Sequence, residues 1–190
     1  CTAQTLASLD ETTLAQDYAY LEKYVGIDKV YLETYRDGTW VAIDHMKMIQ
    51  NFFKEHGVEI AGGITAVTPP LEKDDAKRQR LFQTFCYSNE TMRTYLKKIV
   101  TYTAELFDEI ILDDFFFTSC TCDDCLRERS NLSWAEFRSN KMIDVAENLV
   151  LKPAKLANPS VKVTIKYPNW RESYHETGYV PKIQPSMFDK

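Results

Sequence analysis

The sequence predicts an α/β protein whose parallel strands form a (β/α) barrel of the TIM type, with the N-terminal half present in these 190 residues. Two observations carry this prediction. Helical and strand patterns alternate from end to end with turn residues between them, which is typical of parallel sheets. The element lengths fit a barrel rather than an open doubly wound sheet, but only four of eight units are present, because a complete barrel takes about 250 residues.

Eight elements make up the four units. In chain order we expect a helix over residues 10–24, a strand over 30–36, a helix over 44–56, a strand over 58–67, a helix over 88–107, a strand over 109–117, a helix over 133–157 and a strand over 161–167. We treat residues 1–9 as an N-terminal tail and residues 10–190 as the barrel domain. That domain is expected to be truncated where a loop leads toward a fifth strand.

Caps and glycines set the boundaries of the first two units. Asp10 is a plausible cap for the first helix and Gly26 ends it. Gly57 closes the second helix in the same way. The pair Gly62 and Gly63 inside the second strand indicates a bend or a close approach between neighbouring backbones.

The later units begin after the break Thr68-Pro69-Pro70, which opens a charged loop. Ser88 is the expected cap of the third helix. Ser133 with Glu136 makes a capping-box start for the fourth helix. Pro153 is expected to kink or divide that helix, because proline cannot donate the backbone hydrogen bond that the helix requires.

Bulk composition is that of an ordinary soluble globular protein, with 44% hydrophobic and 27% charged residues. The 28 acidic and 23 basic residues are well mixed, so no basic stripe suggests nucleic acid as a partner. No apolar run reaches the roughly 20 residues that a transmembrane helix needs. The 11 Tyr, 10 Phe and 3 Trp could line a cleft suited to sugar rings, although most aromatic residues belong to cores.

Polar side chains follow the predicted strands at their carboxyl ends, where the active site of a parallel barrel lies. Asp113 falls in the set that alternation turns toward the lumen, whereas Asp114 joins it only if the strand end twists or bulges. Either residue is a candidate catalytic carboxylate, and the alternative is that it caps a loop. The residues that we expect to shape a sugar subsite are Glu33, Arg36, Thr65, Lys166, Tyr167 and Trp170.

Glycosidic cleavage commonly uses two carboxylates, one that protonates the leaving oxygen and one that attacks the anomeric carbon or activates water. Only one half of such a pair is placed here, so we expect its partner beyond Lys190. Glu33 is as suited to binding a substrate hydroxyl as to chemistry. Lys166 either lowers the pKa of a carboxylate and keeps it ionised, or forms a structural ion pair with Glu33 or Asp113.

Four cysteines can supply the ligands of a closed tetrahedral zinc site, namely Cys86, Cys120, Cys122 and Cys125. Such a site has no open position, so its zinc would hold the loop beside the active site and would not be the catalyst. Disulfides among the same residues are the main alternative, and a redox pair of Cys122 and Cys125 is a weaker one. A zinc hydrolase acting through bound water would require an open metal position.

The C-x-C-x-x-C run after an acidic strand end, with one cysteine upstream, resembles the zinc cluster of bacterial β-galactosidases with a barrel fold. The resemblance implies that the four cysteines are the zinc ligands. Residues 30–36, 62–65 and 112–115 are similar in layout to the broader glycoside-hydrolase-like barrels, a likeness that covers most of the chain from residue 10. Asp113-Asp114 replaces the Asn-Glu pair of the β-galactosidases, so neither the identity of the acid nor galactoside specificity carries over.

Cys1 resembles the lipid-modified first residue of a mature bacterial lipoprotein. That resemblance implies a lipid anchor and a location outside the cytoplasm, in the periplasm or at the cell surface. The alternative is that Cys1 is only the first residue of a fragment, which leaves a cytoplasmic location open.

The sequence therefore predicts a glycoside hydrolase-like protein that cleaves or binds a glycan, with a structural zinc–thiolate loop beside its active site. As an enzyme, the full-length barrel would be an O-glycosyl hydrolase. The rival hypothesis is a non-catalytic carbohydrate-binding or structural protein that zinc stabilises.

Overall fold

The structure is a computed structural model that describes residues 1–68, 81–169 and 174–190. A five-stranded sheet runs through it in the order β2-β1-β3-β4-β5. Four strands are parallel and follow one another in chain order, while the short β2 pairs antiparallel with β1. The strands are β1 (Lys29–Arg36), β2 (Thr39–Trp40), β3 (Glu59–Ile64), β4 (Glu109–Leu112) and β5 (Lys162–Ile165).

Helices connect the strands and flank the sheet. They are α1 (Ala3–Ser8), α2 (Glu11–Tyr24), α3 (Ile43–Glu55), α4 (Glu90–Leu106), α5 (Asp123–Arg129), α6 (Trp134–Val145), α7 (Lys152–Ala157) and α8 (Tyr174–Thr177). Short 3-10 turns occupy Leu81–Gln83 and Gln184–Ser186. Residues 1–9, which we treated as a tail, contain α1, and its Ala3 and Leu6 are buried.

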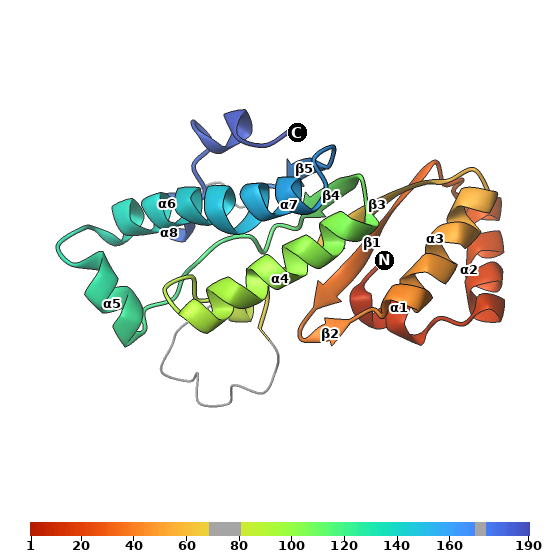
Figure 1. Cartoon of the computed structure of the whole chain (residues 1–190), viewed down its shortest axis with the longest axis horizontal. Helices are drawn as coiled ribbons and strands as arrows, with labels where there is room; N and C mark the ends of the chain where they lie inside the picture. The colour runs from red at the N-terminus through yellow and green to blue at the C-terminus, as the bar shows by residue number, and fades with distance from the viewer. Residues whose placement is uncertain (69–80, 170–173) are drawn as a thin grey trace.

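The crossover helices pack on one face of the sheet, and α4 lies side by side with the long helix formed by α6 and α7 (Figure 1). Leu32 of β1 shares a buried cluster with Ile49 and Phe53 of α3. Ile110 of β4 and Val163 of β5 share a second cluster with α4 and α6. Sequential strands with crossovers on one face have the winding of a barrel, whereas a doubly wound sheet carries helices on both faces. The predicted α/β class is confirmed, but over the described residues the sheet stays open.

Both ends of the chain lie along the sheet. The amino group of Cys1 donates to the Tyr31 carbonyl at 2.7 Å, and the Cys1 carbonyl accepts from the Glu33 amide at 3.1 Å. These two bonds have the pattern of a parallel ladder. At the other edge the Asp189 amide donates to the Val163 carbonyl at 2.9 Å, so the C-terminal residues run beside β5.

Most of the predicted caps are confirmed. Asp10 caps α2, and Ser133 with Glu136 forms the capping box of α6. The prediction of Ser88 as the cap of α4 is wrong, because the cap is Asn89, whose side chain accepts from the backbone of the first turn. The charged loop predicted over residues 69–80 lies outside the described residues.

The strand predicted over residues 109–117 is too long. β4 ends at Leu112, and Asp113 begins a turn in which its carbonyl accepts from the Phe116 amide at 3.0 Å. The Asp113 side chain also accepts from the Asp114 amide at 2.9 Å, a local bond that competes with the sheet ladder. β3 and β5 likewise end earlier than predicted.

Pro153 divides the fourth long helix, as predicted, without ending it. The helix runs from α6 into a π-helical segment, Ala146–Leu151, and continues as α7 with Pro153 in its first turn. Proline lacks the amide that an α-helix would direct at the carbonyl four residues earlier. A wider π turn directly before proline accommodates that missing bond.

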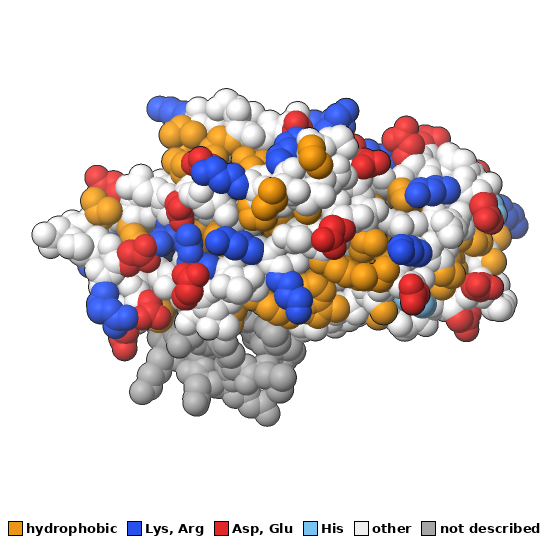
Figure 2. Space-filling model, viewed as in Figure 1, with side chains coloured by type: hydrophobic (Ala, Val, Ile, Leu, Met, Phe, Trp, Pro, Cys, Tyr) orange, Lys and Arg blue, Asp and Glu red, His pale blue; other side chains and the backbone are white. Residues whose placement is uncertain are grey.

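The helix-covered face carries acidic and basic side chains interspersed over α4, α6 and α7 (Figure 2). Because the two kinds of charge are mixed, the described residues of that face form no basic stripe (Figure 2). Across the described ranges, no helix combines the length and apolarity needed to cross a bilayer.

Candidate active site

The predicted site residues come from the carboxyl ends of all four parallel strands. Glu33 and Arg36 lie on β1, Thr65 directly follows β3, Asp113 directly follows β4, and Lys166 directly follows β5. Parallel strands end at a common edge of the sheet, so these side chains can meet there. The hydrogen bonds described below join all five into one network.

A β-bulge brings Glu33 and Arg36 to the same face. Strict alternation would place residues three apart on opposite faces of the sheet. The pairing of β1 with β3 shifts register between Glu33 and Tyr35, which inserts one extra residue and turns Arg36 back toward Glu33. The guanidinium then donates to both Glu33 oxygens, at 2.6 and 2.8 Å.

Glu33 uses both carboxylate oxygens on protein donors. Besides Arg36, it accepts from the Thr65 hydroxyl at 2.7 Å and from the Ala3 amide of α1 at 3.0 Å. Its exposed fraction is 9%. A buried carboxylate with this many donors is held in a fixed geometry, and it fixes Arg36 in turn.

Asp113 lies at the centre of the charged network. Lys166 Nζ is 2.9 Å from its Oδ1, and Arg36 Nη2 is 3.2 Å from its Oδ2. Burial alone would raise the pKa of the Asp113 carboxyl, but hydrogen bonds from Lys166 and Asp114 outweigh burial and the net pKa is lowered. Asp113 is therefore the more acidic member of the pair.

The pKa of Asp114 shifts in the opposite direction. Burial, followed by the adjacent charge of Asp113, raises the pKa of the Asp114 carboxyl, although Lys166 Nζ lies 3.5 Å from its Oδ1. Each carboxylate disfavours ionisation of its neighbour, because like charges repel. Of the two carboxyls, Asp114 therefore binds a proton more readily.

Tyr167 and Trp170 are the two remaining residues that we predicted for the sugar subsite. Tyr167 lies 3.4 Å from Gln184 through its hydroxyl and packs with the rings of Tyr174 and Tyr179. Burial raises the pKa of Tyr167 to about 12. The structure does not bring its hydroxyl into the charged network. Trp170 lies outside the described residues.

The four predicted cysteine ligands converge in one cluster. Their sulfur atoms all lie within 4.8 Å of one another, and Cys86, Cys120 and Cys125 are buried. The Sγ atom of Cys86 is 3.6 Å from those of Cys122 and Cys125, which are 3.7 Å apart. A disulfide bond measures about 2.05 Å, so the disulfide alternative does not describe this arrangement. Four thiols at this spacing can hold a metal ion.

The surroundings of the cysteine cluster affect the charge of its thiols. Hydrogen bonds that Cys86 donates to Cys120, and that Cys120 donates to Cys125, raise the pKa of Cys86 and of Cys120 to about 12. Without a cation these groups stay protonated at neutral pH. Arg138 of α6, which donates to the Ser119 carbonyl at 3.0 Å, lies close enough for the charges of Cys125 and Cys120 to act on it. A four-thiolate metal centre would carry negative charge that Arg138 offsets.

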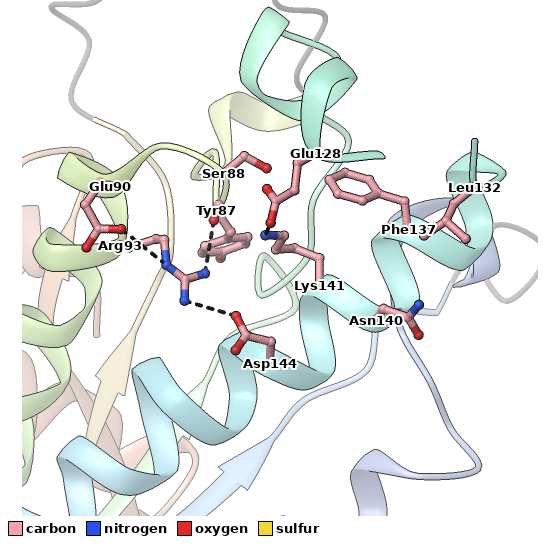
Figure 3. A pocket seen from close by; sticks show the side chains of 10 residues that line it. All are labelled: Tyr87, Ser88, Glu90, Arg93, Glu128, Leu132, Phe137, Asn140, Lys141 and Asp144. Carbon is pink, nitrogen blue, oxygen red and sulfur yellow. Dashed lines mark hydrogen bonds and ion pairs between the residues drawn. The ribbon is translucent and has the colours of Figure 1, made fainter. Parts of the chain in front are cut away.

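A pocket of about 540 Å³ lies between α4, α5 and α6. Its charged groups pair across the opening: Arg93 with Asp144 at 3.0 Å, and Lys141 with Glu128 (Figure 3). Asp113 does not line this pocket. The pocket is thus a feature of the helix layer, separate from the strand-end network.

Comparison with known proteins places the chain in a family. A family model described as "Probable glycosyl hydrolase, catalytic domain" matches residues 1–190. The chain belongs to this family. The chain is also 32% identical, over 212 aligned positions, to the uncharacterized protein SSO3021 of Saccharolobus solfataricus. That alignment covers 99% of the chain but 35% of the relative, so the chain spans about a third of its length.

Two solved glycosidase structures share the fold of this glycosyl hydrolase domain. An α-L-fucosidase (isoenzyme 2) from Paenibacillus thiaminolyticus superposes with a TM-score of 0.61 at 11% identity, over 80% of this chain and 29% of that one. A β-galactosidase from Rahnella sp. R3 superposes with a TM-score of 0.63 at 10% identity, over 85% of this chain and 34% of that one. The resemblance to glycoside hydrolases drawn from the sequence is confirmed.

Sequence reasoning missed two residues, one that contacts the strand-end network and one that lies near the cysteine cluster. The amide of Ala3 binds Glu33, but nothing in residues 1–9 signals a contact with a strand thirty residues away. Arg138 lies on α6 at a position that helical periodicity marks only as polar. The capping box that starts α6 was visible, but the direction of that helix relative to the cysteine loop was not.

Proposed function

We propose that this domain supplies the acid/base half of a glycosidase active site, with Asp113 and Asp114 as its reacting carboxyls. The observation that carries the proposal is the position of the two carboxyls at the strand ends, where Lys166 Nζ lies 2.9 Å from Asp113 and 3.5 Å from Asp114. The pKa shifts of the two groups in opposite directions support it. A glycosidase needs one protonated carboxyl to assist the leaving oxygen, and its pKa must be raised for that role. The pKa of Asp114 is raised in the direction that this role needs, first by burial and then by the adjacent Asp113.

Each remaining member of the network has a proposed task. Lys166 keeps Asp113 ionised, and Arg36 is positioned by Glu33 so that one of its nitrogens faces Asp113. Thr65 donates to Glu33 at 2.7 Å and lies 3.4 Å from Asp113. The pair cannot fill both catalytic roles, because the two carboxyls of a glycosidase stand about 5 Å or more apart on either side of the bond.

The second catalytic carboxylate is therefore proposed to come from outside these 190 residues. The curated relative is about three times longer than the part that the chain matches, which leaves room for it. We propose that the open sheet is part of a closed (β/α) barrel in the whole protein. The sequential strand order, the helices on one face and the glycosidase folds that superpose on the chain all support this.

The metal at the four cysteines is proposed to be zinc in a structural role. Zinc–sulfur bonds of about 2.3 Å in a tetrahedron separate the sulfur atoms by about 3.8 Å. The three Sγ separations of 3.6, 3.6 and 3.7 Å come close to that value, and all four sulfur atoms lie within 4.8 Å of one another. With four thiolate ligands zinc keeps no open position, so it would hold residues 120–125 in place and leave the chemistry to the carboxyls.

The test is turnover of 4-nitrophenyl glycosides by the intact protein, starting with α-L-fucopyranoside and β-D-galactopyranoside. Wild type should release 4-nitrophenol from at least one of them. Asp113→Asn should lose about 100-fold or more of that turnover, since it removes one of the two carboxyls proposed to take part in the reaction. Its circular dichroism spectrum and bound metal should equal those of wild type.

Full activity of Asp113→Asn would remove Asp113 from the mechanism. Sugar binding by wild type without hydrolysis of any glycoside would instead support the rival hypothesis of a non-catalytic carbohydrate-binding protein.

A further inference from the structure

We propose that Phe82, supported by the Phe115 ring, forms an aromatic platform on which a pyranose ring of the substrate stacks, beside Asp113 and Asp114. This inference rests on the proposed glycosidase function and extends it. The charged network can bind hydroxyl groups but offers no apolar surface to the sugar ring, and the platform would supply that surface.

Phe82 is an exposed ring supported by other rings. Its exposed fraction is 63%, which is unusual for a phenylalanine in a protein with a well-formed core. Its centroid lies 5.4 Å from that of Phe115 and 6.5 Å from that of Phe117, with nearly perpendicular planes in both pairs. Neighbouring rings therefore fix Phe82 on one side while leaving much of it accessible.

The platform adjoins the carboxyls directly. Phe115 follows Asp113 and Asp114 in the turn after β4. The guanidinium carbon of Arg36 lies 5.8 Å from the centroid of the Phe115 ring, while Nη2 of the same side chain is 3.2 Å from Asp113. Arg36 thus touches both the aromatic and the acidic part of the site.

The backbone at Phe82 is held in an unfavourable conformation. Phe82 and Gln83 have φ angles of 54° and 56°, in the left-handed region that bulky residues rarely adopt. Buried side chains hold the turn, since Thr68 donates to the Gln83 carbonyl through its amide at 2.8 Å and its hydroxyl at 3.0 Å, and Ser119 accepts from the Leu81 amide at 2.7 Å. Backbone strain that surrounding contacts maintain in this way is frequent at functional sites.

A sugar ring fits this combination of groups. One face of a pyranose presents C–H bonds, which pack on an aromatic ring, and its rim presents hydroxyls, which bind carboxylates and guanidinium groups. An exposed aromatic ring next to Arg36 and two carboxyls offers both kinds of contact within one site.

The experiment compares Phe82→Ala, Phe82→Trp and Tyr20→Ala with wild type in the intact protein. Tyr20 of α2 is the matched control, because it is 65% exposed and lies outside the strand-end network. The probe is whichever 4-nitrophenyl glycoside wild type hydrolyses best. Phe82→Ala should raise KM by about 3- to 10-fold, the loss expected for one aromatic contact, with kcat little changed. Phe82→Trp should restore KM, and Tyr20→Ala should leave it unchanged.

An unchanged KM in Phe82→Ala would overturn the platform. So would a lower melting temperature of Phe82→Ala with unchanged KM, since Phe82 would then be a structural contact within the intact protein. Phe82→Gly provides a second check, because glycine adopts the left-handed conformation without strain. The platform predicts that KM of this variant rises as it does in Phe82→Ala, and an unchanged KM would overturn the platform.

Saturation-transfer NMR with methyl glycopyranosides separates failure of the platform from failure of the proposed function. If wild type hydrolyses nothing but binds a methyl glycoside, and Phe82→Ala weakens that binding, the platform stands and the glycosidase proposal falls. If wild type binds no glycoside, the platform falls with it.

Discussion

Arg36 donates two hydrogen bonds to Glu33, at 2.6 and 2.8 Å, although the two residues are only three apart on one strand. The β-bulge in β1 makes this contact possible by turning both side chains to the same face. The same guanidinium reaches Asp113 across the sheet at 3.2 Å. One local irregularity of β1 therefore positions the cation that links two carboxylates from distant parts of the chain.

Replacing Arg36 should destabilise the protein. Arg36→Met leaves Glu33 buried without its counter-charge, and we expect the free energy of unfolding to fall by about 2–3 kcal/mol. Arg36→Lys keeps the charge but loses the two-pronged contact, so it should cost less. Urea denaturation of both variants measures the difference. Equal stability of Arg36→Met and wild type would show that Glu33 does not depend on this partner.

Lys166 should set the acid limb of the pH–activity profile. The lowered pKa of Asp113 means that this carboxyl stays charged until the pH falls below its usual range, and activity that needs the charge is lost only there. Lys166→Met removes the closest cation, so the Asp113 pKa should rise and the acid limb of kcat/KM should move to higher pH. Lys162→Met, at the other end of β5, is the matched control. An acid limb that moves equally in both variants would exclude a specific role for Lys166.

The cysteine cluster should bind one metal ion per chain. Cys120→Ser removes a buried ligand, so the purified protein should lose its metal and about 3 kcal/mol or more of stability. Cys1→Ser is the control, since Cys1 is exposed and lies outside the cluster. Metal analysis by mass spectrometry and thermal unfolding provide the two measurements. Retention of a full metal equivalent by Cys120→Ser would contradict a four-thiolate centre.

Gly62 and Gly63 should respond differently to alanine. A Cβ atom at Gly62 would lie 2.7 Å from Thr103 and 2.8 Å from Phe107, so Gly62→Ala should cost about 1–3 kcal/mol through overpacking against α4. A Cβ at Gly63 would meet Glu33 at 3.1 Å, a milder contact on the opposite face. Gly63→Ala should therefore cost less stability but raise KM by displacing Glu33. Chemical denaturation and steady-state kinetics of the two variants distinguish the faces, and equal stability losses would contradict this assignment.

Local signals in the sequence were sufficient for much of the fold. Asp10 and the Ser133–Glu136 box mark helix starts because a cap acts on amides within three residues of itself. The glycine pair in β3 marks the close approach that α4 and Glu33 make to that strand. The strand-end prediction for Asp113 and Lys166 succeeded because parallel strands share an edge, which follows from chain order alone.

Other features depend on contacts that no local pattern encodes. The bulge at Glu33 arises from the pairing of β1 with β3. Asn89 and not Ser88 caps α4, because a difference of one residue in the start of the helix decides which side chain faces the free amides. The turn at Asp113 ends β4 early through a side-chain bond that competes with the ladder.

The sequence by itself determined the α/β class, the order of the elements, the four clustered cysteines and the acidic strand end. Only the tertiary structure decided that the pKa values of Asp113 and Asp114 shift in opposite directions, because burial and the Lys166 ammonium act on the two carboxyls through space. It also decided that the Glu33 carboxylate accepts hydrogen bonds from Arg36, Thr65 and the Ala3 amide. Periodicity and caps act between near neighbours in the chain, whereas electrostatic environment and hydrogen-bond partners are set by residues that folding brings together from far apart.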